Sequence, residues 1–331
     1  MRYDVIAVGG ATEDLAFYVH DYVLINNQRD VLNQKLLAFD YGAKIPVNKT
    51  FISFGGGAAN AAVTLASLGL KVALMSMVGD DGRGRRIIHN LEQRRVKTGL
   101  VQTKRRGISS ISFIIIGAGN EHVSFSDRAV ADDFKIKPHH LRALKHADWI
   151  YLSSLSGQWR DNLQKLFALP KAKIFWNPGS RQLAAGHTAL KSFLRKTEVL
   201  SINKDEALHL LTSHSSHHKK PKAWLNEVKN LLKTINAWGP KIVLITEGAR
   251  GISAYDGRKF YHQLAIKAKT KADTTGVGDA FASAFLAGLK MYHGDIERSL
   301  KLGAYNAAAK ITEQGAQNGI LDRIDAKRLK I

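Results

Sequence analysis

Residues 273–280 read Asp-Thr-Thr-Gly-Val-Gly-Asp-Ala, and they lead into FASAFLAGLK, a stretch with strong helical character. The small residues Gly276, Val277 and Gly278 predict consecutive backbone N–H groups at a helix N-terminus, where unpaired donors and the helix dipole favour an anion. The two glycines allow a close approach that a side chain would block. The stretch therefore predicts an anion-binding turn that opens a helix.

Asp279 falls in the first turn of this predicted helix. A carboxylate beside a bound phosphate is electrostatically unfavourable unless it accepts a proton from a nucleophile. Phosphoryl transfer needs both features, because donors stabilise charge on the transferring group while a base orients and deprotonates the attacking hydroxyl. The simpler interpretation is that Asp279 caps the helix, and these residues alone leave it open.

Apolar runs alternate with amphipathic stretches along most of the chain. The runs are YDVIAVGG (3–10), KVALMSMVG (71–79), WIYLSSL (149–155), KIFWNPG (173–179), VLSIN (199–203) and KIVLITEG (241–248). Between most of them, apolar residues recur at helical spacing, as in AWLNEVKNLLKTI (223–235). This alternation predicts a parallel sheet covered on both faces. Ligands of such sheets bind beyond the carboxyl ends of the strands.

Two segments break the alternation. Residues 12–54 contain apolar runs without a clear helix, and residues 108–126 read as two strands joined at Gly117–Asn120, a hairpin signal. We expect one domain over residues 1–331. Within it, a small β-sheet from about 12–54 and 105–126 projects from the main body and covers the site as a lid.

The composition excludes several classes of protein. The chain has 331 residues and no cysteine, which excludes disulfide scaffolds, thiolate zinc sites and cysteine nucleophiles. Its start lacks the apolar core of a signal peptide, and no apolar run is long enough to span a bilayer. We expect a soluble, cytoplasmic protein. The histidine-rich stretch 214–220 contains no carboxylate or cysteine that could complete a metal site, so it predicts a solvated loop.

The chain is strongly basic, with 49 Lys and Arg against 28 Asp and Glu and a net charge of +21. Such an excess attracts polyanions. Many of the basic residues crowd between Arg83 and Arg106, but no aromatic residues interleave them to stack bases. We interpret this run as a solvated helix face and do not expect a nucleic-acid partner.

The loop FGGGAAN (54–60) lies between an apolar run and a helical stretch, where a dinucleotide-binding loop would stand. A Rossmann dehydrogenase needs G-x-G-x-x-G in the first strand–helix turn and an acid about 20 residues further on. Here Gly9 and Gly10 lead into ATED, and the later loop ends in Asn60. The pattern speaks against that class.

The sequence resembles the ribokinase family, the PfkB-type carbohydrate and nucleoside kinases, nearly from end to end. GGGAANAAVTLASLG (55–69) with VGDDGRG (78–84) resembles its amino-terminal signature, and DTTGVGDAF (273–281) its carboxy-terminal one. NPG (177–179), NKDE (203–206), TEGARG (246–251), AYNAAA (304–309) and EQGA (313–316) follow in the family's order. The resemblance implies a ribokinase-like α/β fold: a central, mostly parallel sheet flanked by helices, with a small β-sheet lid.

The resemblance implies roles for residues of the phosphate-donor side. Asp279 would be the general base, and Gly276, Val277 and Gly278 would form the anion hole. Asn203 and Glu206 match an N-x-x-E motif that holds Mg²⁺ and phosphates largely through water. The nucleotide would contact Thr246, Gly248 and Gly251, with Asn306 bordering the adenine. Asp273 and Thr275 are compatible with a monovalent cation such as K⁺, which many family members bind.

For the acceptor side, the resemblance implies Asp14, Gly56, Gly57 and Asn60. A phosphorylated acceptor would need a cation, for which Arg128 and Arg160 are candidates. A nucleoside would need an apolar slot, for which Phe17, Tyr18 and Phe113 are candidates.

We expect ATP- and Mg²⁺-dependent phosphorylation of a hydroxymethyl group of an unphosphorylated sugar. The alternatives are a nucleoside kinase of the same family and, from another class, a non-catalytic nucleic-acid-binding protein on this fold. Lid strands often pair between subunits in this family, so a homodimer is compatible with the sequence.

Overall fold

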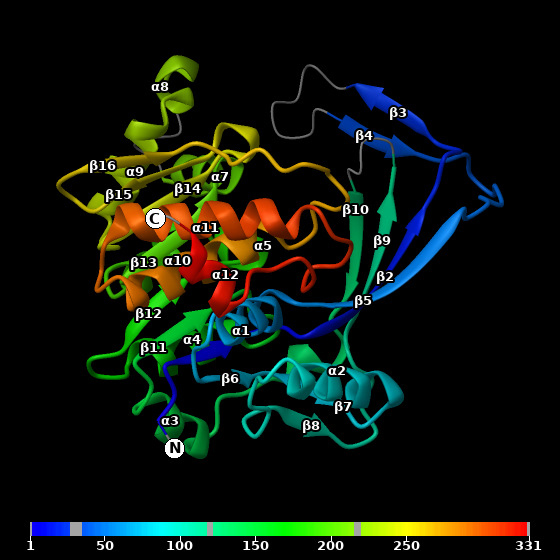
Figure 1. Cartoon of the computed structure of the whole chain (residues 1–331), viewed down its shortest axis with the longest axis horizontal. Coiled ribbons are helices and arrows are strands. Elements are labelled where there is room, and N and C mark those ends of the chain that lie inside the picture. Colours follow the sequence, from blue (N-terminus) through cyan, green and yellow to red (C-terminus); the bar gives the residue numbers. More distant parts are fainter. Residues whose placement is uncertain (1, 27–34, 118–121, 215–219, 330–331) are drawn as a thin grey trace.

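The computed structural model describes residues 2–26, 35–117, 122–214 and 220–329, and these form two main sheets of unequal size (Figure 1). The larger has the strand order β16–β15–β14–β13–β12–β11–β1–β6. Its pairs are parallel except β14–β15 and β15–β16. Its strands are β1 (Val5–Val8), β6 (Val72–Met75), β11 (Trp149–Leu152), β12 (Lys173–Trp176), β13 (Val199–Asn203), β14 (Ile242–Thr246), β15 (Ile252–Tyr255) and β16 (Phe260–Gln263).

Helices cover both faces of this sheet, because its central strands are apolar on both sides. In β1, Val5 and Ala7 join one buried cluster, whereas Ile6 and Val8 join another. The first cluster includes α1 (Gly57–Ser67), α2 (Gly82–Gln93), α10 (Val277–Met291), α11 (Ile296–Lys310) and α12 (Arg323–Arg328). The second includes α3 (Pro138–Leu144), α4 (Trp159–Phe167), α5 (Ser180–Ala184), α6 (Gly186–Leu194), α7 (Lys204–Thr212), α8 (Lys222–Asn226) and α9 (Val228–Ala237). The predicted α/β fold is confirmed.

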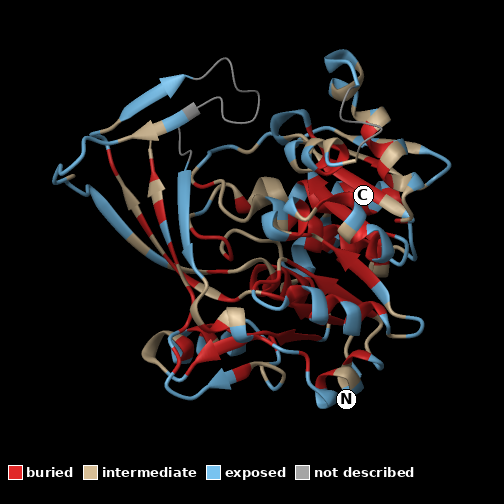
Figure 2. Ribbon diagram, turned by 180° about the vertical axis from the view of Figure 1, so that it is seen from behind, coloured by how far each residue is buried: buried red, intermediate tan, exposed pale blue. Residues whose placement is uncertain are grey.

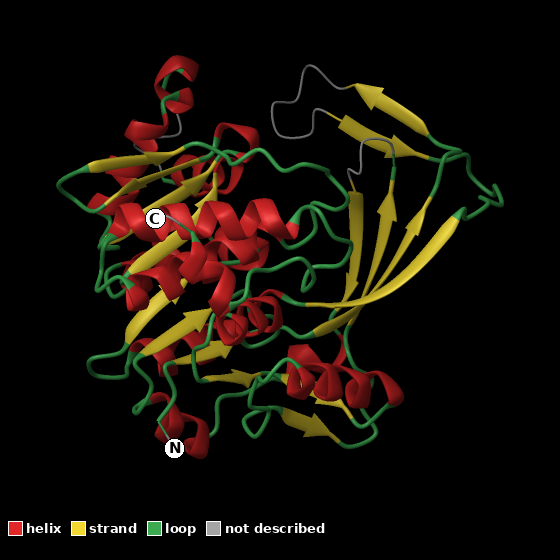
Figure 3. Ribbon diagram, viewed as in Figure 1, coloured by secondary structure: helices red, strands yellow, loops and turns green. Residues whose placement is uncertain are grey.

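The smaller sheet stands beside the main body (Figure 3). Its order is β10–β9–β2–β5, and only β2–β9 is a parallel pair. The strands are β2 (Thr12–Tyr18), β5 (Lys49–Gly55), β9 (Ile111–Ile116) and β10 (His122–Asp127), and β3 (Val23–Asn26) pairs separately with β4 (Lys35–Ala38). Strands β9 and β10 pair antiparallel, as the hairpin signal predicts. The residues between them, 118–121, and residues 215–219 of the histidine-rich stretch lie outside the described residues.

Side chains alternate between the two faces of the smaller sheet, as they do in any strand. Asp14 pairs in register with Ser112 and Ala16 with Ile114, and all four are buried. The residues between them point to the opposite face, where Phe113 is 39% exposed. Figure 2 shows the resulting contrast between this sheet and the buried core of the main body. Phe17 and Phe113 therefore face away from the Asp14 side, and of the three expected aromatic residues only Tyr18 lies on that side, packed against Ala16 and Ile116.

Helix α10 begins where the sequence predicts. Gly276 is its N-cap, with a φ of +74° that favours glycine, and Asp279 lies in the first turn. Most of α10 is buried, because Ala, Ser and Gly along it allow close packing against α1 and α11. Short elements complete the fold: β7 (Met77–Gly79), β8 (Gln102–Lys104), and the 3₁₀ turns Ala129–Asp133 and Gly248–Arg250. No helix within the described ranges is both long and apolar enough to cross a membrane.

Candidate active site

A cavity of about 270 Å³ lies between the smaller sheet and the carboxyl ends of β1 and β11. We call it the acceptor cavity. It brings together residues predicted from three distant segments: Asp14, Gly56, Gly57, Asn60, Thr275, Gly276 and Asp279. Ser112, Ser124, Ser126 and Arg128 also line it. Of these four, the sequence reasoning considered only Arg128, although serines alternate with apolar residues in β9 and β10.

Asp279 faces this cavity from the N-terminal end of α10. It is half-buried, and its Oδ2 accepts a hydrogen bond from Asn60 Nδ2 at 2.8 Å. Burial raises the pKa of Asp279, the nearby charge of Asp14 raises it further, and the hydrogen bond from Asn60 acts in the opposite direction. No cation pairs with Asp279 in the part of the chain that the structure describes. The carboxylate of Asp279 is therefore held by a hydrogen bond and not by a counter-ion.

A chain of amide side chains holds Asn60 in place. Asn60 Oδ1 accepts from Gln317 Nε2 at 3.2 Å, and Gln317 Oε1 accepts from Asn90 Nδ2 at 2.8 Å. All three amides are buried, so each hydrogen bond fixes the orientation of the next. Asn60 lines the cavity, as the prediction of an acceptor-binding residue requires, and its amide N–H group also orients the carboxylate of Asp279. Gln317 and Asn90 were not predicted, because neither belongs to a motif.

Asp14 lines the cavity from the middle of β2. It is only 4% exposed, and its Oδ1 accepts from Thr12 Oγ1 at 2.8 Å. Burial raises its pKa, hydrogen bonds from Thr12 and Ser112 lower it, and the charges of Asp273 and Glu13 raise it. A buried carboxylate surrounded by hydroxyl groups suits vicinal hydroxyls of a ligand.

Two glycines let the backbone of the first loop approach its neighbours. Gly56 has a φ of +89°, and a Cβ there would lie 2.5 Å from the carbonyl oxygen of Gly10. A Cβ at Gly57 would overlap Ser153 Oγ and approach Asp279 Oδ1 to 3.3 Å. The loop therefore packs against the base only because it lacks side chains.

The anion-binding turn is braced by Asp273. Its Oδ1 accepts from the N–H of Thr275 at 2.8 Å and its Oδ2 from the N–H of Gly315 at 2.9 Å. Burial opposes ionisation, but the Thr275 hydrogen bond and the positive charge of Lys310 hold the pKa of Asp273 below its usual range. The carboxylate therefore stays ionised and fixes the loop before Gly276, Val277 and Gly278.

Asn203 and Glu206 bind each other across the first turn of α7. Glu206 N donates to Asn203 Oδ1 and Asn203 N donates to Glu206 Oε2, both at 2.8 Å, which is a capping box. Burial raises the pKa of Glu206, the hydrogen bond from Asn203 lowers it, and the charge of Asp279 raises it. A carboxylate and an amide oxygen, as in Glu206 and Asn203, are ligands that suit a hard cation such as Mg²⁺.

The predicted nucleotide residues fall into two groups. Thr246 ends β14, in register with Asn203 of β13, and Gly248 and Gly251 form the turn that follows, both with positive φ. Asn306 differs from the expectation. It is completely buried, its Nδ2 donates to the carbonyl of Ala280 and its Oδ1 accepts from Leu321 N, each at 2.8 Å. Its amide therefore joins α11 to α10 and to the segment before α12, inside the protein.

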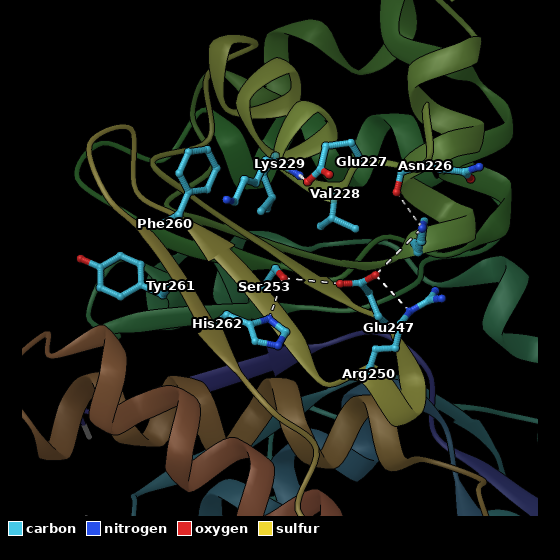
Figure 4. Close-up of a pocket in the computed structure, with 12 residues that line it drawn as sticks. Asn226, Glu227, Val228, Lys229, Glu247, Arg250, Ser253, Phe260, Tyr261 and His262 are labelled. Carbon is cyan, nitrogen blue, oxygen red and sulfur yellow. Dashed lines mark hydrogen bonds and ion pairs between the residues drawn. The ribbon is translucent and has the colours of Figure 1, made fainter. Parts of the chain in front are cut away.

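Another cavity, of about 550 Å³, lies between β14–β16 and helices α8 and α9 (Figure 4). Three of its charged side chains form ion pairs with one another: Glu247 lies 3.4 Å from Arg250 and 4.0 Å from Lys204. Ser253 bonds both Glu247 and His262. None of the predicted site residues lines this cavity, so we do not assign it to the reaction.

Several arginines of the basic run make contacts inside the protein. Arg86 forms two hydrogen bonds to the buried carboxylate of Glu13, at 2.7 and 2.8 Å, and Arg83 donates to the carbonyl of Ser109. Arg94 donates to the carbonyl of Gln317. The run therefore supports the walls of the site. Arg160, a candidate for an acceptor phosphate, instead lies over the ring of Trp159.

Known proteins resemble this chain over most of its length. The ATP-dependent 6-phosphofructokinase of Thermoanaerobacterium thermosaccharolyticum is 24% identical over 312 residues, which cover 89% of each chain. The ribokinase of Thermotoga maritima has the same fold, with a TM-score of 0.79 at 18% identity over 98% of each chain. The nucleoside kinase of Methanocaldococcus jannaschii has a TM-score of 0.75 at 19% identity, over 98% of this chain and 97% of its own.

Fold and comparisons together define a phosphotransferase with an alcohol group as acceptor. The chain belongs to the pfkB family of carbohydrate kinases, whose family model matches residues 24–323. It is thus a sugar or nucleoside kinase of an ATP-using family. The predicted family and the ribokinase-like fold are confirmed.

Proposed function

We propose that this protein transfers the γ-phosphoryl group of ATP to a hydroxymethyl group of a sugar. One observation carries the proposal: a carboxylate with a raised pKa, Asp279, lies between a hydroxyl-lined cavity and the N–H groups that open α10. The cavity would hold the acceptor, and the turn would hold the transferring group.

The reaction divides between these two sides. The acceptor oxygen attacks the γ-phosphorus, its proton passes to Asp279, and the bond from the γ-phosphorus to the bridging oxygen breaks in line. Asn60 orients the carboxylate toward the cavity. The N–H groups of Gly276, Val277 and Gly278 stabilise the charge on the equatorial oxygens. Mg²⁺, held by Glu206 and Asn203 through water, would supply further positive charge to the phosphates when bound.

The smaller sheet would act as a lid. Its Asp14 face covers the cavity, while its strands continue into the loops that carry Gly56 and Arg128. An acceptor seated under it would be shielded from water, which suppresses hydrolysis of the donor.

An unphosphorylated sugar remains our first candidate as acceptor, because Asp14 and three serines can satisfy several vicinal hydroxyls. The nucleoside alternative draws on the resemblance to the Methanocaldococcus jannaschii nucleoside kinase. Phe17 and Phe113 give it no support, because they point away from the cavity, but Tyr18 lies on the same face of β2 as Asp14, beside Phe51.

A second candidate is a sugar that carries an anionic group, such as a phosphate. Arg128 is half-buried at the cavity wall, and among the described residues its guanidinium has no hydrogen-bonded or ion-paired partner. Burial and the positive charge of Arg181 lower its pKa, and Asp132 only partly compensates. A dianionic phosphate would supply the missing counter-charge.

A panel of neutral sugars, sugar phosphates and nucleosides, assayed for ADP release, tests the proposal. Asp279→Asn should lower kcat on the best acceptor by about 10²–10⁴-fold while acceptor and ATP still bind. Arg128→Met should raise KM only for an anionic acceptor. Near-normal turnover by Asp279→Asn refutes the mechanism. RNA binding that survives Asp279→Ala, with no turnover of any polyol, would instead support the non-catalytic alternative.

A further inference from the structure

A lysine side chain lies entirely inside the protein beside the anion-binding turn. Lys310 is the last residue of α11, and its side chain is 0% exposed. Lysine is among the residues least often fully buried, because removing an ammonium from water is costly unless oxygen atoms replace the water. Such a side chain calls for a reason beyond packing.

Oxygen atoms surround this ammonium. Lys310 Nζ donates to the backbone carbonyl of Asp273 at 3.0 Å and to that of Glu313 at 3.3 Å, and it lies 3.8 Å from Asp273 Oδ2. Two carbonyls and a carboxylate are the ligands that a bound monovalent cation would use. The ammonium thus has the environment of an ion, although it is part of the chain.

The ammonium also joins the two segments that shape the anion-binding turn. Asp273 precedes the turn and accepts from Thr275 N, whereas Glu313 belongs to the segment after α11, whose Gly315 N donates to Asp273. The two segments are in close contact, since a Cβ at Gly276 would lie 2.6 Å from the Cβ of Ala316. Without the ammonium, two carbonyl oxygens and a carboxylate would face one another uncompensated.

The K⁺ ion implied by the resemblance does not fit these residues. The acid among its expected ligands, Asp273, already binds Lys310 through its backbone carbonyl and lies 3.8 Å from the ammonium through Oδ2, and the carbonyl of Glu313 binds it as well. A free K⁺ would have to share them with an ammonium that cannot leave, and at such short distance the two positive charges repel strongly.

We propose that Lys310 is a positioning residue that provides this positive charge from within the chain and makes turnover independent of added monovalent cations. The inference rests on the proposed kinase function. Lys310 touches neither the acceptor cavity nor Asp279. It acts by holding Asp273, and through Asp273 the N–H groups that stabilise the transferring phosphoryl group.

The first test uses the unaltered protein. Turnover is compared in buffers whose only monovalent cation is K⁺, Na⁺ or tetramethylammonium, at one ionic strength and with Mg²⁺ and ATP saturating. Equal kcat values are expected. A several-fold stimulation by K⁺ over tetramethylammonium would overturn the inference.

The second test replaces the lysine. Lys310→Met fills the space without the charge, and kcat should fall by about 100-fold, as for a small displacement of catalytic groups, with no cation restoring it. Lys310→Ala leaves room beside the oxygens, so K⁺, NH₄⁺ or ethylamine should restore turnover in a saturable way, and tetramethylammonium should not. Lys301→Ala, an exposed position on the same helix, is the control. Wild-type turnover by Lys310→Met, or folded Lys310→Ala that no cation restores, contradicts the inference.

Thermal unfolding separates this inference from the kinase assignment. If no acceptor is phosphorylated, the proposed function fails, yet K⁺ should still raise the Tm of Lys310→Ala and leave that of the wild type unchanged relative to tetramethylammonium. A K⁺-specific rise in the wild-type Tm would contradict the role of Lys310 whatever the activity.

Discussion

The surroundings of Asp279 favour its protonated form more than water does. Its pKa is raised by burial and by the charge of Asp14, so kcat/KM should fall with decreasing pH through a value above the ordinary aspartate pKa of about 4. The base must be ionised to accept a proton, so activity is present above this pKa and lost below it. The pH profile of kcat/KM, recorded with a non-ionising acceptor, measures the apparent pKa below which activity is lost.

Asp14→Asn provides the control for this profile. The charge of Asp14 raises the pKa of Asp279, so removing it should move the loss of kcat/KM to lower pH. The substitution should also weaken acceptor binding. An apparent pKa of the wild type at or below 4 would show that another group controls the rate. An apparent pKa that does not change in Asp14→Asn would show the same.

Gln317 should matter for catalysis although it lies behind Asn60. Gln317→Leu removes the hydrogen bond to Asn60 and leaves the Asn90 amide buried and unsatisfied, so stability should fall by about 1–3 kcal/mol. If Asn60 loses its orientation, kcat should fall by about tenfold, while the KM for ATP stays unchanged. The comparison is with Gln93→Ala, an exposed glutamine on α2. A stability loss without a kcat effect would make Gln317 purely structural.

At the scale of the element, the entry into α1 depends on the absence of a side chain at Gly57. Gly57→Ala places a methyl group against Ser153 Oγ, and such overpacking should cost about 1–3 kcal/mol of unfolding free energy. Removing the hydroxyl in Gly57→Ala/Ser153→Ala should restore most of that loss. Urea denaturation of the single and double variants measures both. Equal stabilities of the two variants would mean that the loop shifts instead.

The elements that the sequence predicts are those with local signals. Helix α10 starts at Gly276 as predicted, because the glycine turn and the small residues after it act within a few positions. The sequence does not reveal which face of β2 and β9 covers the site. Alternation places Asp14 and Phe113 on opposite faces, but only tertiary packing decides which face lies over the cavity. The hydrogen bonds of Asn306 were not predictable for the same reason, since a motif does not reveal which carbonyl its amide binds.

The least predictable parts of the site are contacts between distant residues. Asn60 and Gln317 are separated by 257 positions, and Lys310 meets Asp273 across 37. No pattern in the sequence marks Lys310, which in a basic chain looks like one more surface lysine at the end of a helix. Only the pairing of α10 with α11 turns it inward.

For the whole molecule, the charge of +21 should have little effect on the reaction. Arg83, Arg86 and Arg94 of the basic run bind groups within the protein, so they are partly neutralised. We expect RNA to inhibit the kinase reaction only at low salt. Inhibition should vanish near physiological ionic strength, because binding through phosphates alone is strongly salt-dependent. A titration of RNA into the kinase assay at two salt concentrations measures this. Inhibition that persists at the higher salt would indicate a specific nucleic-acid site.

The hydrogen bond between Asn60 and Gln317 has a consequence for synthesis of the protein. The base is oriented by an amide near the start of the chain, which in turn is held by one close to its end. On the ribosome, the main sheet can begin to assemble once β11 and β12 have emerged, but this contact waits for nearly the last residues. A nascent chain can therefore form most of its main sheet well before the contact that orients Asp279 is complete.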